Sequence, residues 1–167
     1  ELLTKELIVA NSKVVFLYNL LGLILVEQKK IDEAIQCYKD GIKIDPNFAM
    51  IYNNLGLLYF RHKPECDIKE IENYYLKAIS LDKELIEAHN NLGSLYNKND
   101  KVEKAINCYK NAININPKFS FAHHNIGAAY VSLGKFKEAT KHFKESIKLN
   151  PKFVDTHRML SRIKKYS

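Results

Sequence analysis

Three histidines at equal spacing are the residues of this sequence that first suggest chemistry, because imidazole is a common metal ligand. His89, His123 and His157 are 34 residues apart, and the same slot holds Tyr18 and Tyr52 earlier in the chain. Residues that recur at a constant period lie one structural repeat apart, whereas a metal ion needs its ligands to converge. We therefore expect packing roles for these histidines and predict no metal site.

The three cysteines give no stronger signal for catalysis or metal binding. Cys37, Cys66 and Cys108 are odd in number and lack CxxC spacing, so neither a disulfide framework nor a zinc knuckle is indicated. A reducing compartment is the simpler interpretation, and we expect a cytoplasmic protein. The sequence shows no phosphate loop, HExxH motif, nucleophile elbow or paired carboxylates. We predict no catalytic site and no cofactor, so the chain is not expected to be an enzyme by itself.

The net charge of +7 raises the question of nucleic acid. It comes from 23 Lys and only three Arg, spread mostly over expected outer helix faces. Proteins that read bases or phosphates favour arginine and aromatic side chains on one face, so we predict a solvated lysine surface and no nucleic-acid partner. The most apolar run, residues 14–26, is interrupted by Asn19 and is shorter than the roughly 20 residues of a membrane span. No membrane insertion is expected.

One seven-residue motif occurs three times in nearly the same form. It is NNLGLLY at residues 53–59, NNLGSLY at 90–96 and HNIGAAY at 124–130. Spacings of 34, 37 and 34 residues separate the corresponding glycines, which are Gly22, Gly56, Gly93 and Gly127. Self-similarity at a fixed period of this length indicates a stacked repeat array.

Each repeat contains two predicted helices. Its apolar residues follow helical spacing, as in Ala105, Ile106, Tyr109 and Ala112, and no segment alternates with the period of two that a strand requires. The first helix, called helix A here, contains this seven-residue motif with its glycine. The second, helix B, ends at an Asp or Asn followed in most repeats by Pro, which closes one helix and starts the next. With 46% apolar and 27% charged residues, one soluble domain with a core is expected.

This pattern resembles the tetratricopeptide repeat, a 34-residue helix pair with an early aromatic, then Leu-Gly and Tyr in helix A, then Ala, an aromatic and a small residue in helix B, then Pro. The fourth repeat presents His123, Gly127, Tyr130, Phe143 and Pro151 at these positions. The resemblance implies an all-α fold, a right-handed superhelical solenoid of antiparallel helix pairs. We divide this single domain (1–167) into helix B of a preceding half-repeat (1–14), four repeats (15–48, 49–85, 86–119, 120–153) and a capping helix (154–167).

The second repeat departs from the pattern by three extra residues. Its longer turn is RHKPECD, residues 61–67, in which Pro64 prevents helix A from running on. We interpret the turn as a tolerated insertion at a loop tip, with a protruding contact loop as the alternative. Since both ends of the chain fit half-repeats, we expect a piece of a longer array.

In this family the A helices line the inner surface of the solenoid. The leucine of each Leu-Gly pair points into the core, so the residue before it faces the groove. In three consecutive repeats this residue is asparagine: Asn54, Asn91 and Asn125. An asparagine amide both donates and accepts, which suits a peptide main chain whatever its side chains, although simple solvation is the alternative. The apolar residues expected to support the peptide are Met50, Leu57, Phe60 and Phe121.

Comparison within the family sharpens the functional prediction. Co-chaperone members hold a terminal carboxylate with Lys and Arg, but the corresponding positions here are Asn19, Glu87 or Phe121, and Asn91 or Asn125. A clamp for chaperone tails is therefore not expected. The asparagine ladder is similar to that of the O-linked N-acetylglucosamine transferase superhelix, which holds extended polypeptide. We predict a protein-binding scaffold that holds an extended polypeptide in its concave groove.

Two other functional classes stay open. The chain is alternatively the substrate-recruiting arm of a larger transferase, either a glycosyltransferase or a sulfotransferase. The ending HRMLSRIKKYS, residues 157–167, is similar to the junction at which bacterial repeat arrays pass into a sulfotransferase domain. The third class is a self-association module, which would form a homo-oligomer and which light scattering would detect.

Overall fold

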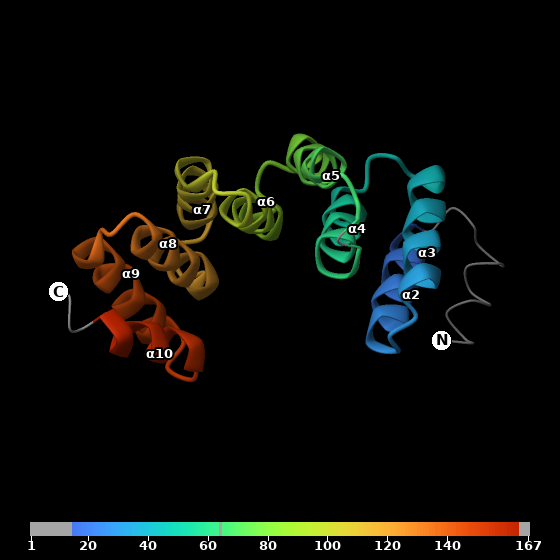
Figure 1. Cartoon of the computed structure of the whole chain (residues 1–167). Helices are drawn as coiled ribbons and strands as arrows, with labels where there is room; N and C mark the ends of the chain where they lie inside the picture. The colour runs from blue at the N-terminus through green and yellow to red at the C-terminus, as the bar shows by residue number, and fades with distance from the viewer. Residues whose placement is uncertain (1–14, 64, 164–167) are drawn as a thin grey trace. The chain divides into compact units, whose positions relative to one another are not determined.

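Nine α-helices make up the part of the chain that the computed structural model describes, residues 15–63 and 65–163, and this part contains no β-strand. The helix bounds are α2 Val15–Glu27, α3 Ile31–Ile44, α4 Ala49–His62, α5 Ile68–Leu81, α6 Ile86–Lys98, α7 Val102–Ile115, α8 Ser120–Ser132, α9 Phe136–Leu149 and α10 Val154–Ile163. Consecutive helices form the antiparallel pairs expected for the repeats (Figure 1). The all-α repeat architecture predicted from the sequence is confirmed.

The helix starts follow the repeat period. Helices α2, α4, α6, α8 and α10 begin at residues 15, 49, 86, 120 and 154, where the sequence places the starts of the four repeats and of the capping helix. These are the A helices, and α3, α5, α7 and α9 are the B helices. The predicted half-repeat at residues 1–14 and the last four residues of the predicted cap lie outside the described residues.

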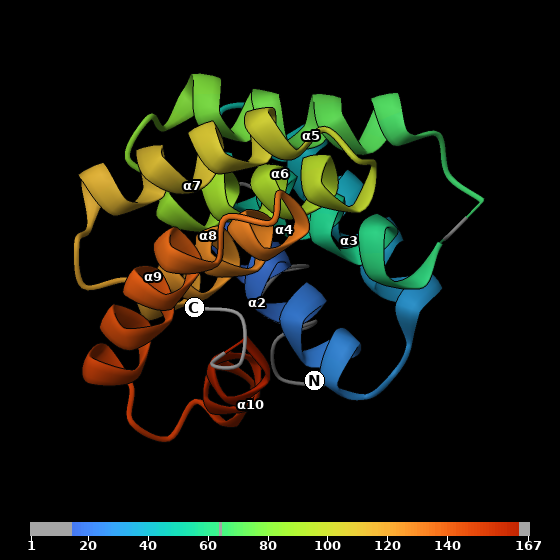
Figure 2. The same cartoon turned by 60° about the vertical axis from the view of Figure 1, so that its left-hand side comes forward.

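Tertiary contacts divide the chain into two compact units, Glu1–Ala88 and His89–Ser167. In the first unit α3 packs against both α2 and α4, and α4 also packs against α5, around buried residues that include Leu25, Ile51 and Leu55. In the second unit α9 packs against α8 and α10 (Figure 2), and Phe143 and Ile163 lie in the buried cluster between them.

A glycine of each helix A faces an aromatic ring of helix B in the same repeat. A Cβ atom added to Gly127 would lie 2.7 Å from Cε1 of Phe143, closer than carbon atoms normally approach. Gly22 stands in the same relation to Tyr38. The missing side chain allows each ring to lie directly against the backbone of helix A, which sets a close approach of the two helix axes.

The three short turns between helices A and B share one backbone geometry. Each contains a residue in the left-handed region, with φ of 62° at Lys29, 57° at Asp100 and 68° at Gly134. The next backbone N–H then donates to the carbonyl five residues earlier, as from Lys135 to Tyr130 at 2.9 Å. This arrangement satisfies carbonyls at the end of helix A and reverses the chain within a few residues.

The second repeat reaches helix B by a longer route. Helix α4 ends at His62 and α5 begins at Ile68, where the carboxylate of Asp67 accepts a hydrogen bond from the backbone N–H of Lys69 at 3.0 Å. Across this turn the Lys63 ammonium pairs with the Asp32 carboxylate at 2.7 Å. An N-cap and a surface ion pair thus replace the left-handed residue of the short turns.

The turns from helix B to the next helix A are also built alike. The Asp or Asn that ends helix B accepts, through its side chain, the backbone N–H two residues later. These bonds join Asp45 to Asn47, Asp82 to Glu84, Asn116 to Lys118 and Asn150 to Lys152. The second turn keeps this bond although Lys83 stands in place of proline, so the Asp or Asn is the shared element.

Candidate functional site on the A helices

The predicted groove asparagine Asn54 is part of a side-chain network in the first unit. It is half-buried on α4, and its Nδ2 donates to Oδ1 of Asn19 on α2 at 2.8 Å. Its own Oδ1 accepts a hydrogen bond from Nδ2 of Asn53 at 3.3 Å. Asn19 is only 3% exposed. One amide hydrogen of Asn54 is therefore committed to the protein, while an amide carries two such hydrogens and two oxygen lone pairs.

The second unit repeats this arrangement. Nδ2 of Asn125 on α8 donates to Oδ1 of Asn90 on α6 at 2.8 Å, with the same separation of 35 residues as in the first pair. Asn125 is half-buried, as is the third predicted asparagine, Asn91. Both bonds join the residue two before the glycine to the residue three before the preceding glycine. Amide pairs thus link α2 to α4 in the first unit and α6 to α8 in the second, a role that the sequence interpretation did not assign.

The predicted apolar groove residues differ in exposure. Met50 and Phe121 are 44% and 50% exposed, whereas Leu57 and Phe60 are half-buried. The ring of Phe121 packs against that of Phe153, with ring centroids 5.0 Å apart. Large exposed apolar side chains on the A helices of both units are consistent with a contact surface, although single ones also occur on ordinary surfaces.

In the first unit several of these residues line a hollow. It has a volume of about 180 Å³ and is lined by Leu23, Met50, Asn53, Asn54, Leu85 and Glu87. Its walls therefore combine aliphatic side chains with two asparagine amides and one carboxylate. Such a mixture of apolar wall and few polar groups is typical of ligand sites.

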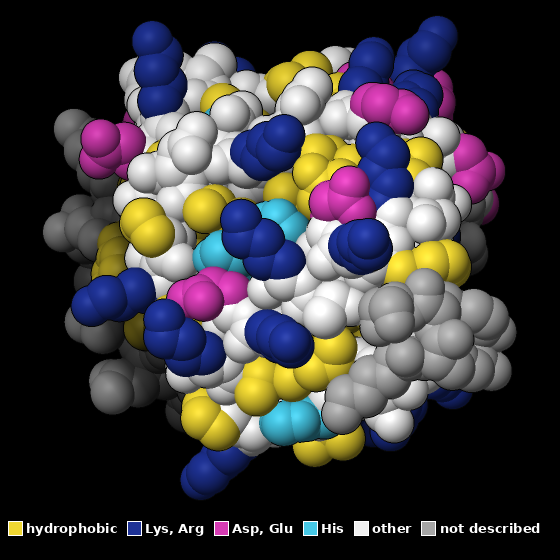
Figure 3. All heavy atoms as spheres, turned by 90° about the vertical axis from the view of Figure 1, so that its left-hand side faces the viewer, with side chains coloured by type: hydrophobic (Ala, Val, Ile, Leu, Met, Phe, Trp, Pro, Cys, Tyr) yellow, Lys and Arg dark blue, Asp and Glu magenta, His cyan; other side chains and the backbone are white. Residues whose placement is uncertain are grey.

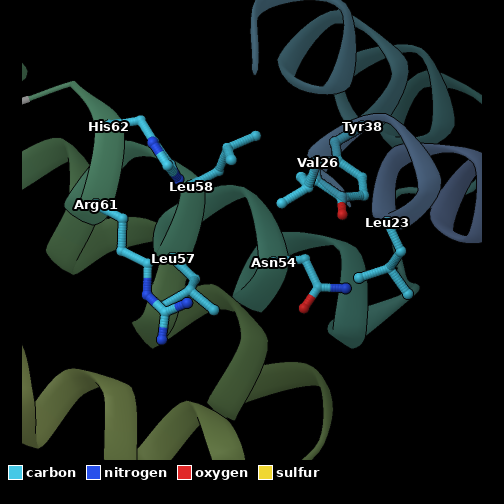
Figure 4. Close-up of a pocket in the computed structure, with 8 residues that line it drawn as sticks. All are labelled: Leu23, Val26, Tyr38, Asn54, Leu57, Leu58, Arg61 and His62. Carbon is cyan, nitrogen blue, oxygen red and sulfur yellow. The ribbon is translucent and has the colours of Figure 1, made fainter. Parts of the chain in front are cut away.

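A second cavity adjoins the first, since Leu23 and Asn54 line both. Its volume is about 60 Å³, and Figure 4 shows its walls, contributed by α2, α3 and α4. The lining residues are Leu23, Val26, Tyr38, Asn54, Leu57, Leu58, Arg61 and His62. Tyr38, Arg61 and His62 are additions to the predicted site. Tyr38 belongs to the expected helix B of the first repeat, and Arg61 and His62 to the inserted turn, so no pattern in the sequence linked these three residues to the groove.

The aromatic slot of the A helices has a structural role, as the sequence predicts for its histidines. The Tyr52 hydroxyl donates to the carbonyl of Pro46 at 3.0 Å. Nε2 of His123 lies 3.1 Å from the carbonyl of Pro117, and Nε2 of His157 lies equally close, at 2.9 Å, to that of Pro151. In α4, α8 and α10 this bond attaches the first turn of the helix to the turn before it. The slot is therefore used for the same contact whether it holds tyrosine or histidine.

His123 also contacts a histidine on helix B. Its Nδ1 lies 3.4 Å from Nδ1 of His142, and the ring of His142 stacks on Tyr130. Burial, with the nearby His123, Lys141 and Lys110, lowers the pKa of His142 to about 4. The imidazole is therefore neutral at physiological pH. No group of three or more His, Cys, Asp or Glu side chains suited to a metal ion occurs within residues 15–63 and 65–163.

One face of the molecule shows how charged side chains are distributed there (Figure 3). On the face shown in Figure 3, Lys and Arg side chains lie among hydrophobic, acidic and histidine side chains and do not form one continuous patch. Several bases are paired locally, such as Lys43 with Asp40 at 2.7 Å. Among the helices described, none is long and apolar enough to cross a membrane.

Two family models and one curated protein match parts of this chain. A family model described as "TPR repeat" matches residues 22–63, and one described as "Tetratricopeptide repeat" matches residues 86–119 and 120–153. The "Uncharacterized protein ycf37" of Pyropia yezoensis is 32% identical over 82 residues, which are 49% of this chain and 42% of that protein. The match therefore spans less than half of that curated relative.

Solved structures show the same architecture. The crystal structure of MamA is similar with a TM-score of 0.74 and 27% identity, covering 91% of this chain and 87% of that one. Pseudomonas aeruginosa pilF gives a TM-score of 0.81 at 21% identity, covering 89% and 67%. The first TPR of Spaghetti (RPAP3), bound to the HSP90 peptide SRMEEVD, gives 0.66 at 24% identity, covering 71% and 91%.

Proposed function

This chain belongs to the tetratricopeptide repeat family, and we propose that it is a non-catalytic scaffold whose A helices bind an extended polypeptide. Asn54, Asn91 and Asn125 hydrogen-bond the peptide main chain, and Met50, Leu57, Phe60 and Phe121 support it by apolar contact. Interaction with other proteins is the general role that the family membership supports. The peptide and its place in the groove are the specific part of the proposal.

The observation that carries the proposal is the hollow beside Asn54. Leu23 and Met50, both 44% exposed, line it together with the amide of Asn54. The bond from Asn54 to Asn19 fixes the amide in place and leaves one N–H for a ligand. A fixed amide costs less side-chain entropy on binding than a mobile one. An apolar floor with an oriented amide suits a peptide backbone whose side chains alternate toward and away from the protein.

The remaining parts of the proposal concern location and other partners. We place the protein in the cytoplasm, since Cys37, Cys66 and Cys108 form no disulfide among the described residues and cysteines outside disulfides are typical of reducing compartments. We propose no nucleic-acid partner, because 23 of the 26 basic residues are lysine and the basic side chains on the face shown in Figure 3 are dispersed.

The proposal is tested with a peptide selected from an array of unstructured peptides and measured by calorimetry. The triple variant Asn54→Ala, Asn91→Ala, Asn125→Ala is expected to bind about one to three orders of magnitude more weakly, since each neutral hydrogen bond contributes roughly 0.5–1.5 kcal/mol. The matched control changes three exposed asparagines of B helices, Asn73, Asn111 and Asn114, to alanine.

Circular dichroism must show that both variants are folded under the assay conditions, because the amide pairs also join A helices. An unchanged affinity in the folded groove variant, or an equal loss in the control, would contradict the proposal.

A further inference from the structure

The tyrosines that face the glycines of the first three repeats differ in how their hydroxyls are bonded. In the third repeat the Tyr109 hydroxyl donates to Oγ of Ser94 at 3.4 Å. Ser94 directly follows Gly93, the glycine against which the Tyr109 ring packs. In the first repeat Leu23 follows the glycine and Tyr38 is the facing ring. A leucine offers no acceptor, so the internal partner that Tyr109 has is missing for Tyr38.

Tyr38 consequently carries an unpartnered hydroxyl at the wall of the small cavity. The residue is only 1% exposed, and its hydroxyl has no hydrogen-bond partner among the described residues, yet it lines the cavity in Figure 4. Tyr75, the corresponding residue of the second repeat, also lacks a partner, but its hydroxyl oxygen is fully enclosed. Burial raises the pKa of Tyr38 well above its ordinary value, so the hydroxyl remains protonated and able to donate.

The other cavity walls are aliphatic and limit what can enter. Leu23 and Val26 come from α2, and Leu57 and Leu58 from α4. A volume of about 60 Å³ corresponds to about four water-sized positions. A ligand group that fits has a short, unbranched hydrocarbon stem and an acceptor at its end. The stem removes apolar surface from water, and the acceptor gives the Tyr38 hydroxyl the partner that it lacks.

The rim of the cavity is basic. Arg61 and His62 line it near the end of α4, and both are exposed. Neither forms an ion pair or a hydrogen bond with the described residues, in contrast to the adjacent Lys63, whose ammonium pairs with Asp32. A cation without a counter-ion at the mouth of an apolar cavity favours a ligand group of negative charge.

We propose that this cavity is a subsite for a glutamate side chain of an extended acidic peptide. The glutamate methylenes pack between Leu23 and Leu57, the Tyr38 hydroxyl donates to a carboxylate oxygen, and Arg61 faces the charge from the rim. The proposal rests on the proposed function, since it names a side chain that the bound polypeptide carries. It assigns to Tyr38 and Arg61 a role in selecting the partner.

The test uses three peptides, acetyl-Gly-Ser-Ala-Xaa-Ala-Ser-Gly-amide, with glutamate, glutamine or norleucine as Xaa, titrated to millimolar concentration and followed by NMR of the isotope-labelled chain. Glutamate should bind more tightly than glutamine, and glutamine about two- to tenfold more tightly than norleucine, which lacks the acceptor. Tyr38→Phe should abolish the preference for glutamine over norleucine. Arg61→Gln should abolish the preference for glutamate over glutamine.

Matched controls lie in the second unit. Tyr109→Phe removes a hydroxyl that is already bonded to Ser94, and Arg158→Gln removes a guanidinium that is bonded to Asp155 at 3.2 Å. Both should keep the preferences of the unmodified chain. Thermal melts of all four variants confirm that each is folded at the titration temperature.

The outcomes separate this inference from the proposed function. Equal binding of the three peptides overturns the glutamate subsite. So does a preference for glutamine over norleucine that persists in Tyr38→Phe. If those peptides still bind and Asn54→Ala weakens them, the scaffold function stands without the subsite. If none of the three peptides shifts the resonances of Asn54 or its neighbours at millimolar concentration, the glutamate subsite is wrong, and the scaffold function is decided separately by the peptide selected from the array.

Discussion

The side-chain amide of Asn54 donates a hydrogen bond to the side-chain oxygen of Asn19, a residue of the preceding A helix that is 3% exposed. A buried acceptor that loses its donor keeps the desolvation cost without the compensating bond. The amide pair therefore contributes to the stability of the folded chain.

Asn54→Ala is accordingly expected to lower the free energy of unfolding by about 1–3 kcal/mol. Urea denaturation followed by circular dichroism measures the loss, and Asn111→Ala, at an exposed position of α7, is the control that should lie within about 0.5 kcal/mol of the unmodified chain. The double variant Asn19→Leu, Asn54→Leu should lose less than Asn54→Ala, because the buried oxygen of Asn19 is removed together with its donor. A single variant as stable as the parent would contradict the buried bond.

Two glycines of the first unit should respond differently to alanine. A Cβ at Gly22 collides with the Tyr38 ring, whereas the nearest atom to a Cβ at Gly56 is Cε1 of Tyr75 at 3.0 Å. Gly22→Ala is expected to cost about 1–3 kcal/mol by overpacking. At Gly56 a smaller clash is offset by the better helix propensity of alanine, about 1 kcal/mol. Thermal melts that rank Gly56→Ala as the more damaging change would refute this packing argument.

Removal of the hydroxyl should have opposite effects on stability at Tyr75 and at Tyr109, two of the tyrosines that pack against glycines. The Tyr75 hydroxyl is enclosed without a partner, and the Tyr109 hydroxyl donates to Ser94. Tyr75→Phe should leave the free energy of unfolding unchanged or raise it, because it removes an unsatisfied polar group. Tyr109→Phe should lower it by about 0.5–1 kcal/mol. Denaturation curves of the two variants measure these changes. An equal loss of unfolding free energy in both variants would mean that the Tyr75 hydroxyl has a hydrogen-bond partner.

Acid should destabilise the second unit through His142. Its folded-state pKa of about 4 lies below the ordinary value of 6.5, so the unfolded chain binds more protons between these two pH values. The stability from the neutral imidazole is complete above about pH 6.5 and is lost as the pH falls toward 4.

The melting temperature of His142→Gln should therefore fall less between pH 7 and pH 4.5 than that of the unmodified chain. His62→Gln, which alters an exposed histidine of the first unit, should keep the original dependence. If the melting temperatures of His142→Gln and of the unmodified chain fall by the same amount between pH 7 and pH 4.5, the buried imidazole is not the acid-sensitive group.

The helix boundaries were predictable because they are local properties of the repeat. Glycine, proline and small residues recur at a fixed period, and α4, α6 and α8 begin at the residues where that period places them. The bonds formed by Asp45 and its equivalents also follow from a local rule, since Asp and Asn accept backbone N–H groups two residues ahead.

The contacts at the candidate site were not predictable in the same way. Asn125 bonds to Asn90, 35 residues earlier, which occupies a different slot of the preceding repeat. Aligning equivalent positions at 34 residues cannot show a contact between non-equivalent ones. The Tyr38 hydroxyl lacks the partner that Tyr109 has because Leu23 stands where the third repeat has Ser94, and the cavity beside it depends on how three helices leave space between them. Such effects come from tertiary packing rather than from periodicity.

The left-handed residues of the short turns bear on protein engineering. Lysine pays a steric cost of roughly 1–2 kcal/mol in this conformation, whereas aspartate tolerates it better and glycine adopts it freely. Among Lys29, Asp100 and Gly134, only the last already holds the residue best suited to the geometry. Lys29→Gly is thus the first choice for a more heat-tolerant variant. Because Lys29 is not among the residues proposed to contact a peptide, thermal robustness can be adjusted there while the specificity of recognition is left to independent selection.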